Sequence, residues 1–132
     1  MIQPILFGLG HGICEATWIL VPPLLGGYPI SMLTLGIIER FLAIMIHVGL
    51  TIMVWNGFQK GQKWRYLFLA IGVHGAVNSS LILFQSLKLT PVQIELCLGV
   101  MAVLLAIYSF HSRKYYTLGG LKNEEKDSKL QP

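Results

Sequence analysis

The chain has 132 residues, of which 54% are hydrophobic and 12% are charged. A mean hydropathy of +0.63 excludes an ordinary soluble domain, whose surface must be wetted by water. The net charge of +4 would suit nucleic acid, but the lysines and arginines gather in one loop and one tail beside apolar segments. Because that pattern is typical of membrane topology, we expect an integral membrane protein in contact with lipid and no nucleic-acid partner.

Four apolar windows follow one another along the chain, and each is long enough to cross about 30 Å of hydrocarbon. Pro22-Pro23 and Gly26-Gly27 are expected to separate the first window from the second. A polar basic stretch over residues 57–65 separates the second from the third, and Thr90-Pro91 starts the fourth. The sequence therefore predicts an all-α, polytopic transmembrane helical bundle with four spans, over residues 2–21, 31–55, 66–87 and 92–110.

The basic residues predict the orientation of this bundle. They lie in the second loop and directly after the last span, at Lys60, Lys63, Arg65, Arg113 and Lys114. The positive-inside rule places both segments, and hence both chain termini, in the cytoplasm. We divide the chain into a transmembrane domain over residues 1–112 and a cytoplasmic polar tail over residues 113–132, expected to be disordered. The expected location is a bacterial plasma membrane.

Three histidines, His11, His47 and His74, lie inside three different apolar windows. Each lies about eight residues from the predicted cytoplasmic end of its window, which corresponds to a depth of roughly 12 Å. One helical turn further in, on the same helix faces, lie Glu15 and Asn78. Ionisable and polar side chains that share one depth in a membrane indicate a functional site.

Two interpretations of these polar residues remain open. As structural residues, they would hydrogen-bond between helices and contribute about 0.6 kcal/mol each on average. For Glu39 and Arg40 this interpretation is stronger, because adjacent helical residues diverge by about 100° and can each pair with a different helix. We expect Glu39 and Arg40 to be structural, or to support the site residues from behind.

As an active site, the same residues suit the activation of water. Glu15 can take a proton from water, while histidine and asparagine side chains stabilise the oxyanion that forms on a cleaved amide. Alternatively, three imidazoles and a carboxylate suffice to bind Zn²⁺ with one open position. The candidate catalytic residues are Glu15, His47, His74 and Asn78, and the candidate metal ligands are His11, His47 and His74. The residues predict zinc as the cofactor, with a metal-free mechanism as the alternative.

Three stretches resemble the YhfC family of intramembrane metalloproteases, which is similar to the CAAX-protease and bacteriocin-processing superfamily. They are Gly8-Leu9-Gly10-His11-Gly12-Ile13-Cys14-Glu15-Ala16, Glu39-Arg40 followed by His47, and His74-Gly75-Ala76-Val77-Asn78. The resemblance covers roughly residues 7–80 and implies an intramembrane endopeptidase. The superfamily motifs are E-E-x-x-x-R, F-x-x-x-H and H-x-x-x-N or D. The resemblance implies that Glu15 activates water, that His47 is the histidine of the second motif, and that His74 and Asn78 match the third motif and bind the oxyanion.

The chain departs from the superfamily pattern at three positions. Cys14 precedes Glu15 where a second glutamate is usual, and Ile19 and Ala43 stand where arginine and phenylalanine are usual. Family members usually carry further helices before the first motif. We therefore expect an N-terminally truncated member of the family.

Two other functions are alternatives to hydrolysis of a peptide or protein substrate. A small four-helix multidrug exporter couples proton entry to drug extrusion through one glutamate in its first helix, as Glu15 would be here. That mechanism gives no role to His47, His74 or Asn78. A catalytically inactive membrane scaffold is the third possibility, and the sequence does not indicate the oligomeric state.

Overall fold

The structure is a computed structural model, and it describes residues 2–113. Within that part, four helices follow one another and no strand occurs. The helices are α1 (Gln3–Leu25), α2 (Ile30–Gln59), α3 (Lys63–Ser86) and α4 (Pro91–His111). Each is long and apolar enough to cross a membrane, which confirms the predicted all-α bundle of four spans. Its orientation stays a prediction, and the predicted tail over residues 113–132 lies, apart from Arg113, outside the described residues.

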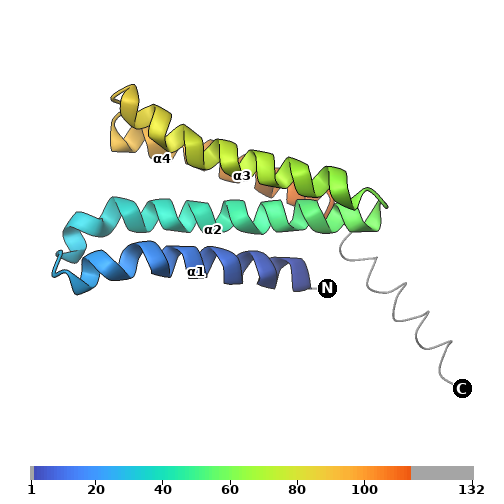
Figure 1. Cartoon of the computed structure of the whole chain (residues 1–132), viewed down its shortest axis with the longest axis horizontal. Helices are drawn as coiled ribbons and strands as arrows, with labels where there is room; N and C mark the ends of the chain where they lie inside the picture. Colours follow the sequence, from blue (N-terminus) through green and yellow to red (C-terminus); the bar gives the residue numbers. More distant parts are fainter. Residues whose placement is uncertain (1, 114–132) are drawn as a thin grey trace, which may run out of the picture.

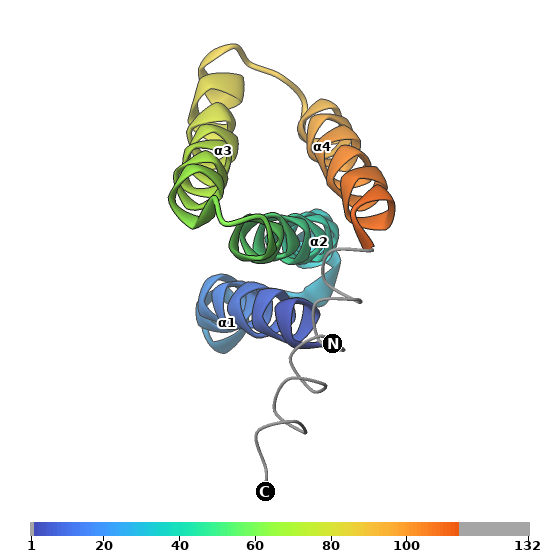
Figure 2. The same ribbon diagram turned by 90° about the vertical axis from the view of Figure 1, so that its right-hand side faces the viewer.

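Helix α2 is the centre of the bundle (Figure 1). It packs along α1 on one side and along both α3 and α4 on the other, whereas α3 and α4 diverge and touch each other at few points (Figure 2). The buried core reflects this order, since Ile46, Leu50 and Met53 of α2 form a cluster with residues of α3 and α4. A side chain near the middle of α2 can therefore meet partners from several helices.

The predicted break between the first two windows is confirmed at Gly26-Gly27, but Pro22-Pro23 do not contribute to it, because α1 continues through both prolines to Leu25. Proline removes an N–H donor, but transmembrane helices tolerate this when other groups satisfy the freed carbonyls. The chain then turns at Gly27, whose φ of +82° lies in the left-handed region that glycine adopts without strain. The N–H of Tyr28 then donates to the carbonyl of Pro23 at 3.1 Å, as in a Schellman motif.

The second loop is shorter than the predicted break over residues 57–65. Helix α2 runs on to Gln59 and α3 begins at Lys63. Gly61, with a φ of +67°, reverses the chain in the same way as Gly27. The polar composition of this stretch predicts a loop, whereas most of it forms the last turn of α2 and the first turn of α3.

The start of the fourth helix is confirmed. Thr90 is its N-cap, and Pro91 follows at the first helical position. The Thr90 hydroxyl accepts a hydrogen bond from the backbone N–H of Gln93, and the Gln93 side chain accepts one from the backbone N–H of Thr90. This reciprocal capping box satisfies two of the N–H groups that a helix start leaves without partners.

Glycines bring α1 unusually close to α2. Gly8 and Gly12 are buried against α2, and a Cβ atom added to Gly8 would lie 2.5 Å from the Cα of Val48. A Cβ on Gly12 would lie 2.9 Å from the Cα of Ile44. This is the small-xxx-small packing by which membrane helices approach each other, a signal in the sequence that our prediction missed. The close approach holds the next turn of α1, which carries Glu15, against α2.

We expect Gly8→Ala to lower the free energy of unfolding by about 1–3 kcal/mol, because its methyl group collides with the α2 backbone. Gly10→Ala is the matched control, since a Cβ at Gly10 meets nothing within 4 Å among the described residues. Both changes remove one helical glycine, so differences in helix propensity cancel. Thermal unfolding in detergent measures both, and equal stability of the two variants would contradict the close packing.

Candidate functional site

The structure brings the three histidines of the predicted spans together. The ring centroids lie 4.6 Å apart for His11 and His47, 5.0 Å for His47 and His74, and 6.4 Å for His11 and His74. They lie eight, twelve and eleven residues from the helix ends at Gln3, Gln59 and Lys63, or roughly 12–18 Å along the helices. Three helices therefore place one imidazole each at a common point well inside the apolar spans.

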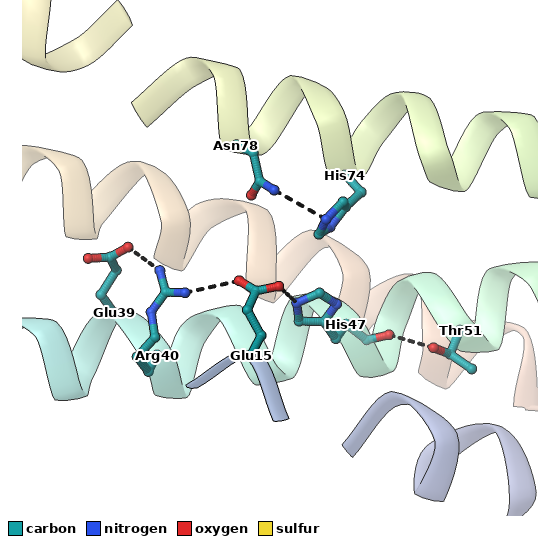
Figure 3. Close-up of polar contacts among 7 residues, drawn as sticks. All are labelled: Glu15, Glu39, Arg40, His47, Thr51, His74 and Asn78. Carbon is teal, nitrogen blue, oxygen red and sulfur yellow. Dashed lines mark hydrogen bonds and ion pairs between the residues drawn. The ribbon is translucent and has the colours of Figure 1, made fainter. Parts of the chain in front are cut away.

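Glu15 joins this group from α1. Its Oε2 lies 3.0 Å from Nε2 of His47, and its Oε1 accepts a hydrogen bond from the Arg40 guanidinium at 3.0 Å. Figure 3 shows the Glu15 carboxylate between these two partners on α2. An Arg–carboxylate bond is stronger and more directional than a neutral hydrogen bond. Glu15 is therefore held in one position, with one oxygen facing the imidazole of His47.

Arg40 links two carboxylates rather than one. Its side chain is buried, and it pairs with Glu39 of its own helix as well as with Glu15 of α1. Our prediction left open that Glu39 and Arg40 would each pair with a different helix, and the structure instead joins them to each other. A buried guanidinium is strongly destabilising only when it is left without any carboxylate partner, and Arg40 has two. Arg40 thus supports Glu15 from behind, on the side away from the histidines.

The donor atoms of His11, Glu15 and His47 all lie within 4.8 Å of one another, a spacing at which a metal ion can be held. Ligand bonds of about 2.0–2.2 Å bring tetrahedral donors to roughly 3.3–3.5 Å apart, so movements of about 1 Å would suffice. Two imidazoles and one carboxylate are a donor set that zinc accepts, with a fourth position open. The predicted ligands were the three histidines, His74 included, with a carboxylate able to complete the set, and which residues bind metal stays a prediction.

His74 and Asn78 come from α3 and point toward the row of Glu39, Arg40, Glu15 and His47 (Figure 3). Asn78 Nδ2 lies 3.2 Å from His74 Nε2, so the amide donates when the imidazole carries its proton on Nδ1. A cavity of about 20 Å³ lies between these groups, lined by Glu15, Glu39, Arg40, His47, His74 and Asn78 together with apolar side chains. That volume holds about one water molecule, and its polar lining supplies the partners that a buried water needs.

Two further polar residues of the apolar spans were not predicted from the sequence, and only the first of them lies beside the site. Glu95 on α4 interacts electrostatically with Glu39 and Arg40, and its Oε2 is buried without a hydrogen bond among the described residues. A lone carboxylate at the start of an apolar window was the signal that could have found it. Asn56 is fully buried and donates to Tyr108 Oη at 3.1 Å and Ser112 Oγ at 2.8 Å. The predicted second span stops one residue before Asn56, whereas the structure has Asn56 within α2, where it connects α2 to the end of α4.

Comparison with known proteins gives one match. A family described as YhfC intramembrane metalloprotease matches residues 24–98, which is more than half of the chain. The matched stretch includes His47, His74 and Asn78, whereas His11 and Glu15 precede it. No curated protein and no solved structure matches the chain. The places of His11 and Glu15 in the site therefore rest on the geometry of α1 against α2.

Proposed function

The chain belongs to the YhfC family of intramembrane metalloproteases, and from that premise we propose that it hydrolyses a peptide bond at Glu15, His47, His74 and Asn78. The observation that carries this proposal is the convergence of His11, Glu15 and His47, whose donor atoms lie within 4.8 Å of one another. Such a group is costly inside apolar spans, and packing alone does not require it. The substrate class is a peptide or protein segment that reaches the site within the membrane.

His11, Glu15 and His47 would hold the metal, and the nitrogen and oxygen donors suit zinc. A bound zinc ion polarises a carbonyl and lowers the pKa of a bound water to about 7. Arg40 keeps the Glu15 carboxylate oriented toward His47. In a metal-free variant of this mechanism, the same carboxylate takes the proton from water directly, and the 20 Å³ cavity beside it is where that water would lie.

His74 and Asn78 would stabilise the oxyanion that develops on the cleaved amide. The side-chain nitrogen of asparagine carries two hydrogens, so Asn78 retains one free N–H after its contact with His74. Hydrogen-bond donors that are already in position stabilise the developing negative charge without having to reorganise. One such donor raises the rate by a factor of about 10²–10³. The α3 pair faces the α1–α2 group across the cavity, so both sets of groups can reach the same peptide bond.

The arrangement favours hydrolysis over proton-coupled export. An exporter needs a membrane carboxylate that exchanges protons and cationic drug freely. Here Glu15 is bonded to both Arg40 and His47, so a cation would have to displace the guanidinium. The contacts of Glu15 thus suit an oriented ligand or base better than an exchange site.

The direct test is cleavage of transmembrane segments in proteoliposomes that contain the purified chain. A library of such segments is incubated with the protein, and mass spectrometry identifies new chain ends. We expect cleavage that stops when a zinc chelator is added and returns when zinc is supplied. Cleavage that continues in chelator would contradict the metal-dependent mechanism, and a library left intact by zinc-loaded protein would contradict the proposed function.

A further inference from the structure

A groove leads away from the histidines along α2, between α1 and α3. It consists of two hollows of about 560 and 340 Å³, which share His11, Thr51 and Val54. The first hollow continues along α1 and α2 to Leu6, Phe7 and Phe58, and the second reaches His47 and His74. Because the hollows meet at His11, they form one groove that begins at the candidate metal ligands.

We propose that this groove, called here the α2 groove, binds the apolar side chains of the substrate peptide next to the bond to be cleaved. The inference rests on the proposed function, because the groove is a substrate site only if the histidines take part in hydrolysis. Phe58 lies eleven residues beyond His47, which is roughly 16 Å along the helix. An extended peptide covers that length with about five residues.

The residues that line the α2 groove determine which substrate side chains can bind there. Apart from His11, the first hollow is lined by aliphatic and aromatic side chains, by Gly10 and by Thr51. The Thr51 hydroxyl donates to the carbonyl of His47 at 2.9 Å, so its hydrogen is already used within α2. A charged side chain in the groove would find no opposite charge among these lining residues and would be costly to bury there. Leucine-like or aromatic residues are therefore the substrate side chains that fit.

Gly10 makes this inference testable without disturbing the helix packing. It lines the first hollow, and a Cβ built on it meets nothing within 4 Å among the described residues. A leucine at this position would extend into the groove, where a substrate side chain is proposed to lie. Gly72 on α3 is the matched control, since its Cβ is equally free and it lines neither hollow.

The experiment measures binding of two hydroxamates to the zinc-loaded full chain in detergent by calorimetry. Acetohydroxamate is small enough to contact only the bound zinc ion. Acetyl-trileucine hydroxamate carries the same zinc-binding group and adds apolar side chains that can enter the groove. We expect the trileucine compound to bind at least about 100-fold more tightly, as burial of leucine side chains implies. Gly10→Leu should remove about 10-fold or more of that gain and leave the affinity for acetohydroxamate unchanged, whereas Gly72→Leu should change neither affinity.

The outcomes separate the two proposals. The α2 groove is not the substrate site if the trileucine compound binds no more tightly than acetohydroxamate. The same conclusion follows if Gly10→Leu and Gly72→Leu bind the trileucine compound equally tightly. If zinc-loaded protein binds neither compound, the proposed metal centre is wrong, and the role of the groove falls with it. The inference is supported if the affinity for the trileucine compound falls in Gly10→Leu but not in Gly72→Leu.

Discussion

Replacing Glu15 by glutamine is expected to lower peptide hydrolysis by about 10²–10⁴-fold while the protein stays folded. Glutamine keeps the shape of the side chain but loses the negative charge and the strong proton-accepting oxygen. Arg40 still pairs with Glu39 in this variant, so no buried guanidinium is left without a carboxylate. The rate is measured on whichever transmembrane segment the natural chain cleaves, and thermal unfolding verifies the fold.

Glu95→Gln is the matched control for this prediction. It makes the same chemical change on α4, and Glu95 is not part of the group formed by His11, Glu15 and His47. We expect its hydrolysis rate to remain close to that of the natural chain. A Glu15→Gln variant that is folded and as active as Glu95→Gln would remove Glu15 from the mechanism.

Arg40→Met is expected to lower the free energy of unfolding by about 3–5 kcal/mol, the largest stability effect foreseen for this chain. The guanidinium is buried and contacts the carboxylates of both Glu15 and Glu39. Its loss leaves two negative charges close together inside the apolar spans without a cation. Unfolding in detergent measures the difference, with Arg65→Met, on an exposed residue at the start of α3, as the control.

A triple variant separates the loss of charge balance from the loss of packing. Arg40→Met combined with Glu15→Gln and Glu39→Gln removes the cation and both anions together. Because replacing a whole buried ion network is often close to neutral, we expect this variant to recover most of the stability lost in Arg40→Met. If the triple variant is as unstable as the single one, the Arg40 side chain acts by packing rather than by charge.

The number and type of elements could be predicted from the sequence because four long apolar windows allow little else in a membrane. The helix ends were less predictable. Pro22-Pro23 would end most soluble helices, but α1 continues to Leu25 and turns at Gly27. Composition likewise assigned residues 57–65 to a loop, although hydrogen bonding keeps most of them helical.

The approach of the three histidines followed from their similar depth in three spans, but the pairing within the site did not. Sequence spacing places Glu15 on a helix face with His11, yet its contacts with Arg40 and His47 arise from the packing of α1 on α2. That packing depends on Gly8 and Gly12, whose spacing signals a close helix contact but does not say which helix approaches. The position of Glu95 near Arg40 also depends on how α4 packs on α2.

The metal content of the purified chain tests the central claim most directly. Three proteins of equal thermal stability are compared by mass spectrometry: the natural chain, the double variant His11→Ala with His47→Ala, and His111→Ala as a control at the exposed end of α4. The proposed centre predicts about one zinc ion per chain in the natural protein and in His111→Ala, and none in the double variant. Zinc retained by the double variant, or absent from all three after loading, would contradict a metal centre at His11, Glu15 and His47.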